Sequence, residues 1–192
     1  MKLVWTKPQN AAGLLQMLTC FLLLISGSAF GVEPQIVVGI EKSGEAFVVD
    51  ATIRAQVPLL TAWEVLTDFD NMTGILSNLA SSKIVRRNGN TLLVDQAGTA
   101  HYGIFSYSFA SAREIRLEPM KRISARQISG NAKRFESELE LSQTGLITLI
   151  RYRAEVVPDS GLGRTFGGRF ILHEVEEQFT AMVAEMKRRS AP

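Results

Sequence analysis

The chain has 192 residues, with 21 lysines and arginines against 19 aspartates and glutamates, and a formal net charge of +2. Two of the basic residues, Lys2 and Lys7, are the only charged residues before Glu33, so the remaining 19 basic residues balance the 19 acidic ones. This balance gives no support to a nucleic-acid partner, which requires an excess of positive charge.

The first 31 residues have the features of a secretory signal. The two lysines precede an apolar stretch centred on residues 14–25, and small residues follow at positions 26–29 and 31. This order is typical of a signal peptide, and the apolar centre is shorter than the roughly 20 residues of a membrane span. We therefore expect residues 1–31 to be a signal peptide, with an uncleaved anchor as the alternative, and the protein to be exported to the periplasm or secreted.

Residues 32–192 contain no cysteine, because the only one, Cys20, lies in the leader. A disulfide, a thiolate metal site and a cysteine nucleophile are therefore excluded from this part of the chain. Its length of about 160 residues is enough for one domain with a sizeable core. We expect a single domain over residues 32–192.

Strand patterns dominate this domain. Residues 47–57 alternate strictly between apolar and other residues, which predicts a strand with one buried face. Pro58 suits the first position of a helix, and apolar residues at helical spacing continue to Phe69, followed by a second short helical piece over residues 72–79. Beyond residue 80, further strands are predicted at about 83–87, 91–100, 104–117, 122–129, 134–143 and 146–157. An Asn-Gly turn at 88–89 joins the first two.

The final segment, residues 167–189, predicts one long amphipathic helix. Its apolar residues fall within an arc of about 120°, namely Ile171, Leu172, Val175, Phe179, Met182, Val183 and Met186. Such a helix needs an apolar surface, and the preceding sheet is the only candidate. We expect residues 158–168 to form a flexible connection into this helix. The predicted fold is α+β: a curved antiparallel sheet of about six to seven strands gripping a C-terminal helix.

Three segments together resemble a known superfamily: the 57–58 boundary followed by WEVLTDF at 63–69, the strand meander, and the closing helix GGRFILHEVEEQFTAMVAEMKRR. The chain is similar to the START-like (SRPBCC) superfamily, and within it to the polyketide cyclase/dehydrase and coenzyme Q-binding branch. The resemblance implies a helix-grip cavity for a lipid, isoprenoid, polyketide or quinone-like molecule. A secretory leader departs from the bacterial relatives, most of which are cytoplasmic.

Aromatic residues on the predicted inner faces are candidates for lining this cavity, although they could equally fill a solid core. Together with the apolar face of the last helix, they give the predicted ligand-binding set: Phe105, Tyr107, Ile150, Tyr152, Val175, Phe179, Met182 and Met186.

Catalytic signatures are weak. His101 and His173 are the only histidines, too few for a metal site of three or more protein ligands. Asp68 and Asp70 follow the first helix, where a capping or turn role is favoured over acid–base work. The segment GLGRTFG at 161–167 misses a dinucleotide fingerprint, because Phe166 stands at the third glycine position. We therefore predict no metal, no cofactor and no catalytic residue.

Local basic clusters at residues 83–87, 121–126 and 187–189 are either solvated faces or contacts to anionic lipid headgroups, which leaves a transient membrane contact open. The sequence favours a carrier of a hydrophobic small molecule. The alternative is an enzyme of the cyclase or aromatase type with His101, Asp68 or Tyr107 as the proton handler. A third reading, a protein-interaction module on the outer face of the sheet, has no specific support.

Overall fold

The computed structural model describes residues 35–159 and 161–191, and the leader predicted for residues 1–31 lies outside this part of the chain. The elements are β1 (Gln35–Ser43), β2 (Ala46–Ala55), α1 (Leu59–Thr67), the 3-10 helix η1 (Phe69–Gly74), β3 (Leu79–Asn88), β4 (Thr91–Tyr102), β5 (Phe105–Glu118), β6 (Arg122–Gly130), β7 (Ala132–Thr144), β8 (Ile147–Pro158) and α2 (Gly161–Ser190).

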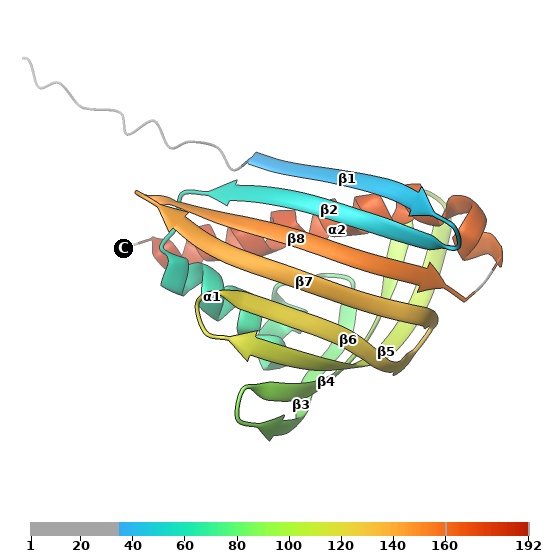
Figure 1. Cartoon of the computed structure of the whole chain (residues 1–192), viewed down its shortest axis with the longest axis horizontal. Helices are drawn as coiled ribbons and strands as arrows, with labels where there is room; N and C mark the ends of the chain where they lie inside the picture. The colour runs from blue at the N-terminus through green and yellow to red at the C-terminus, as the bar shows by residue number, and fades with distance from the viewer. Residues whose placement is uncertain (1–34, 160, 192) are drawn as a thin grey trace, which may run out of the picture. The chain divides into compact units, whose positions relative to one another are not determined.

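The strands form one antiparallel sheet in the order β1-β2-β8-β7-β6-β5-β4-β3 (Figure 1). The inner face of the sheet is the one that faces α2, as expected for a helix-grip α+β fold. Helix α2 packs mainly against β1 and α1, and makes smaller contacts with β2, β8 and β4. The predicted fold class is therefore confirmed, and the sheet has eight strands where six to seven were expected.

Three local expectations were wrong. Strand β1 was missed, although Ile36, Val38 and Ile40 alternate along it, because Gly39 and the charges that follow weaken the pattern. The chain beyond η1 enters β3 at Leu79 instead of forming a second helix over residues 72–79. Helix α2 begins at Gly161, so most of the expected flexible connection is helical.

The core lies at one end of the sheet, next to α1. There Ile53, Ile150 and Met186 have no exposed surface, and Val65 of α1 is equally buried. A buried hydrogen bond from Thr148 Oγ1 to the Val57 carbonyl (2.7 Å) ties β8 to the chain entering α1. We call this the α1 end of the sheet. It carries the turns β3–β4, β5–β6 and β7–β8, and the opposite end carries the turns β1–β2, β4–β5 and β6–β7 together with the start of α2.

Within residues 35–159 and 161–191, no helix is long and apolar enough to cross a membrane.

Candidate functional site

On strands β5–β7 the inner face of the sheet is closely packed at the α1 end and less buried towards the opposite end. Along β7, Leu139 and Leu141 are buried, whereas Ser137 and Phe135 on the same face are half-buried. On β5, Ile115 is buried, whereas the inner-facing residues that precede it along the strand are less buried. The half-buried inner-face residues of β5–β8 are Phe109, Ser111, Arg113, Ala125, Gln127, Phe135, Ser137 and Tyr152. This region is the candidate ligand site.

A guanidinium group lies in this region. Arg113 on β5 pairs with Val94 of β4 and therefore points to the inner face. It donates a hydrogen bond to Gln96 Oε1, and its guanidinium carbon lies 5.7 Å from the centre of the Phe135 ring. Its Nε is buried without a hydrogen-bond partner, and Arg113 forms no ion pair with any of the described residues.

The environment of Arg113 is unusual for an arginine inside a protein, because a buried charge is ordinarily paired. Burial lowers the pKa of Arg113 below its usual range, yet an arginine keeps its proton at any physiological pH. The interior therefore contains a positive charge and a free N–H donor. A carboxylate or a carbonyl oxygen of a bound molecule would satisfy both.

The amide that holds Arg113 is itself held in place. Gln96 is buried on the inner face of β4, and its Nε2 donates to Ser82 Oγ (2.9 Å) on β3. Ser82 in turn donates to the carbonyl of Phe69 (2.5 Å) in η1. These hydrogen bonds orient the Gln96 carboxamide so that its oxygen points to Arg113.

Tyr152 of β8 connects the predicted aromatic set to this arginine. Its ring packs edge-on against Phe179 of α2, with 5.2 Å between ring centres. Burial raises the pKa of Tyr152, while the nearby charge of Arg113 and a hydrogen bond with Ser137 oppose this shift. The phenol is therefore protonated at neutral pH and can donate to an oxygen atom placed near Arg113.

A second polar group joins α2 to the segment that enters β3. Asn78, just before β3, donates from Nδ2 to Glu174 Oε2 of α2 (2.8 Å). Glu174 is 8% exposed, and burial raises the pKa of its carboxyl group. Asn78 Oδ1 and Glu174 Oε1 are both buried without a hydrogen-bond partner.

The other predicted lining residues fall into three groups. Ile150, Phe179 and Met186 lie in the closely packed core, with exposures of 0%, 5% and 0%. Val175 and Met182 are half-buried beside it. Tyr107 is 43% exposed and packs edge-on against Phe170 of α2, 6.2 Å between ring centres. The side chain of Phe105 lies outside the described part of the structure.

The titratable residues considered for catalysis have ordinary structural contacts. Asp68 accepts a hydrogen bond from Asn71 Nδ2 (2.8 Å) and one from Arg189 Nη2 (2.7 Å), and Asp70 accepts from the backbone N–H of Ile84 (2.8 Å). His101 Nδ1 lies 2.9 Å from Ser106 Oγ on the exposed β4–β5 hairpin. Within the described residues, no three His, Cys, Asp or Glu side chains are grouped as a metal site.

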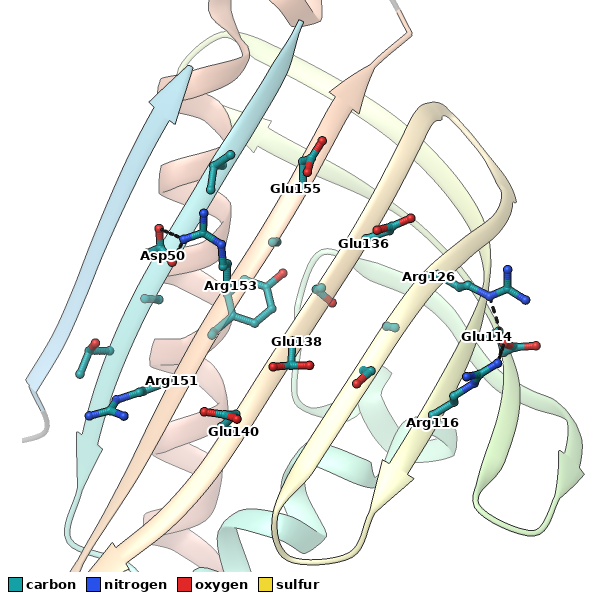
Figure 2. Close-up of a pocket in the computed structure, with 18 residues that line it drawn as sticks. Asp50, Glu114, Arg116, Arg126, Glu136, Glu138, Glu140, Arg151, Arg153 and Glu155 are labelled. Atoms are coloured by element: carbon teal, nitrogen blue, oxygen red, sulfur yellow. Dashed lines mark hydrogen bonds and ion pairs between the residues drawn. The ribbon is translucent and has the colours of Figure 1, made fainter. Parts of the chain in front are cut away.

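A groove of about 820 Å³ lies on the outer face of the sheet, away from α2 (Figure 2). Acidic and basic side chains alternate across its strands. Many neutralise each other, as Arg153 does with Asp50 (2.7 Å) and Arg126 with Glu114 (3.0 Å). This mutual pairing leaves little unsatisfied charge for a ligand, in contrast to the inner face around Arg113.

Comparison with known proteins agrees with this geometry. The family model described as polyketide cyclase/dehydrase and lipid transport matches residues 55–183, more than half of the chain. The chain belongs to this family. A search of curated protein sequences found no match.

Solved structures of the START-like superfamily share the fold. A STAR-related lipid transfer protein from Xanthomonas axonopodis is 8% identical, with a TM-score of 0.67 over 79% of this chain and 93% of that one. The Zhui aromatase/cyclase from a Streptomyces species is 15% identical, with a TM-score of 0.65 over 76% and 96%. Human STARD10 is 14% identical, with a TM-score of 0.58 over 79% and 73%. At these identities the likeness establishes the fold alone.

Four polar residues of the site were missed in the sequence: Gln96, Arg113, Asn78 and Glu174. Arg113 could have been found from the sequence. It alternates in phase with Phe109, Ile115 and Leu117 and therefore lies on the same apolar face of the strand. A charge at an inward position of a strand is costly unless it has a purpose. Asn78 and Glu174 are 96 residues apart, and no local pattern relates them.

Proposed function

We propose that this family member binds or carries a hydrophobic small molecule on the inner face of the sheet, with an anionic or carbonyl oxygen of the ligand bound by Arg113. The single observation that carries the proposal is Arg113, a half-buried residue without an ion pair whose buried Nε lacks a hydrogen-bond partner and whose guanidinium lies beside the Phe135 ring. Apolar burial supplies the affinity at about 25 cal/mol per Å². The arginine selects and orients the polar end of the ligand.

The ligand class that fits is a lipid, an isoprenoid or a quinone-like molecule with a carboxylate or carbonyl group. Phe109, Phe135 and Tyr152 supply flat apolar contacts, and the Tyr152 hydroxyl provides a second donor beside Arg113. No reaction is required for this function.

Fatty-acid binding tests the proposal directly. Titration calorimetry would compare palmitic acid with methyl palmitate, which has the same chain and no negative charge. We expect the acid to bind, and the ester to bind about tenfold more weakly or worse, because a charge-assisted hydrogen bond contributes about 1.5–3 kcal/mol. Arg113→Met should remove the difference between the two. Binding of acid and ester that is equal in the wild-type protein and unchanged for both in Arg113→Met would refute the role of Arg113.

Organic extraction of the protein purified from its native host complements this test. Native mass spectrometry should show a discrete extra mass that is released as a lipid or quinone. An apolar mass with neither a carboxylate nor a carbonyl oxygen would contradict the proposed anchor.

We propose further that the protein is exported and collects its ligand at a membrane surface. Ile104, at the β4–β5 turn, is 93% exposed, and this turn lies at the end of the sheet where the inner face of β5–β7 is less buried. An exposed apolar side chain at such a position can enter a bilayer interface. Ile104→Ser should weaken binding to phosphatidylglycerol vesicles. Leu146→Ser, an equally apolar turn residue at the α1 end with 73% exposure, is the matched control.

The basic cluster on β3 lies beside the β3–β4 turn at the α1 end of the sheet, and it offers an electrostatic membrane contact separate from the one at Ile104. Arg86 and Arg87 carry no ion pair within the described residues, whereas Arg122, Arg126 and Arg189 of the other two clusters are paired with carboxylates. Reversing both charges to Glu should reduce vesicle binding at low salt. The same double reversal at Arg151 and Arg153 on the outer face controls for net charge. N-terminal sequencing of the exported protein tests cleavage of the leader.

Catalysis of the cyclase or aromatase type is the second candidate. It is favoured by the likeness to the Zhui aromatase/cyclase and by Tyr107, whose pKa is raised by burial and by Asp159 and which lies at the less buried end of the inner face. A turnover that is lost in Tyr107→Phe or His101→Ala, with ligand binding intact, would favour this reading over a carrier.

A further inference from the structure

We propose that Asn78 and Glu174 form a second polar subsite, which binds a hydroxyl group of the ligand whose oxygen-bearing end is held by Arg113. This inference rests on the proposed function. It narrows the ligand class to hydroxylated hydrophobic molecules with a carboxylate or carbonyl group.

The first argument is that Asn78 and Glu174 each have a buried oxygen atom without a hydrogen-bond partner. Glu174 is more than nine-tenths buried, and both Glu174 Oε1 and Asn78 Oδ1 lack a hydrogen-bond partner. The bond from Asn78 Nδ2 to Glu174 Oε2 (2.8 Å) fixes the two groups relative to each other. Buried polar atoms are nearly always satisfied, so two unsatisfied oxygens on one bonded pair call for a partner.

The second argument is the position of the pair relative to Arg113. The backbone of Asn78 lies against the inner face of β4 at Gly98: its carbonyl accepts from Thr99 N (2.9 Å), and a side chain at Gly98 would overlap that carbonyl. Gln96, which binds Arg113, is two residues earlier on the same face of β4. Two residues along a strand span about 7 Å. The Arg113–Gln96 pair and the Asn78–Glu174 pair therefore both lie by one short stretch of the inner face of β4.

The third argument is chemical complementarity. Arg113 and Tyr152 offer donors, whereas Asn78 Oδ1 and Glu174 Oε1 offer acceptors. A hydroxyl group can donate its proton to the Asn78 oxygen. The carboxylate oxygen Glu174 Oε1 can accept such a proton equally well. A ligand hydroxyl group would therefore satisfy a buried oxygen that the protein leaves without a partner.

The test uses the full-length mature protein and a set of simple probes: palmitic acid and monohydroxypalmitic acids that differ only in the position of the hydroxyl. We expect wild-type protein to bind at least one hydroxy acid about tenfold more tightly than palmitic acid, since that hydroxyl would satisfy buried groups. Glu174→Met should abolish this preference.

Two further variants make the result specific. Asn78→Leu should also lose the preference, and it keeps the test decisive if Glu174→Met fails to fold. Glu177→Met changes the same charge on a half-exposed side chain one turn along α2 and should retain the preference. Equal binding of palmitic acid and every hydroxy acid by wild-type protein, or a preference that survives in both subsite variants, would overturn the inference. Failure of wild-type protein to bind any of the acids would instead refute the Arg113 anchor.

Discussion

The Gln96 carboxamide accepts a hydrogen bond from Arg113, which forms no ion pair with any of the described residues. Gln96 lies on β4 and Arg113 on β5, and in this strand pair Val94 is opposite Arg113. The side chains of Gln96 and Arg113 therefore both point to the inner face from adjacent strands. The protein thus keeps a positive charge on the inner face of the sheet, with a neutral amide as its hydrogen-bond partner and its Nε unsatisfied. This arrangement costs stability in the empty protein, and a ligand oxygen would recover that cost.

The stability of the empty protein should therefore not depend on the Arg113 charge. In the double variant Arg113→Met, Gln96→Leu, we expect the free energy of unfolding to change by no more than about 1 kcal/mol, or to rise, because apolar groups of similar size replace a buried polar pair. Urea denaturation measures this quantity. A loss of more than about 3 kcal/mol would show that the pair is structural.

Glu174 should make the protein less stable as the pH rises. Its pKa is raised by burial and by the neighbouring Glu177, and lowered by Asn78, His173 and His101. Because the folded protein binds this proton more tightly than the unfolded chain, the stability contribution is full below the usual pKa of 4.5 and is lost as pH rises through the higher folded value. Glu174→Gln should flatten that part of the stability curve, whereas Glu177→Gln should not. An unchanged curve for Glu174→Gln would contradict the burial of this carboxyl group.

The end of α2 is anchored to α1 by charge, and this anchor should fail in acid. Arg189 binds Asp68 (2.7 Å) and Glu185 (2.6 Å), and hydrogen bonds from Arg188 and Arg189 lower the pKa of Glu185 to about 2. Stability from Glu185 is present above its usual pKa and is lost as pH falls towards 2.

The corresponding variant is Arg189→Met, which should cost about 1–2 kcal/mol at pH 7, since these groups are only partly exposed. Arg188→Met is the matched control, because Arg188 is largely exposed and does not reach Asp68. Denaturant unfolding over a pH series measures both effects. Equal losses in the two variants would argue against a specific link between the helices.

Gly98 should tolerate no side chain. A Cβ there would overlap the carbonyl of Asn78, so Gly98→Ala must displace the segment that places Asn78 beside Glu174. We expect a destabilisation of about 1–3 kcal/mol and loss of any preference for hydroxylated acids. Gly39→Ala in β1 is the control, because its Cβ would meet only the Asp50 carbonyl at 3.9 Å. Thermal unfolding distinguishes the two, and a stable Gly98→Ala protein would count against the close contact.

Much of the fold could be predicted from the sequence because it depends on local periodicity. Alternation along residues 47–57 identified β2, and helical spacing from Val175 to Met186 identified the buried face of α2. The failures were local as well: Gly39 disguised β1, and the glycines at 161–168 did not stop α2 from starting at Gly161.

The sequence by itself determined the α+β helix-grip class and the inward side of strands such as β2 and β8, because these follow from the period of apolar residues along a single segment. Only the tertiary structure decided the chemistry of the interior. Arg113 meets Gln96 across two strands, and Asn78 meets Glu174 across 96 residues. Such pairs depend on strand register and on the path of the last helix, which the apolar pattern of any one segment does not encode.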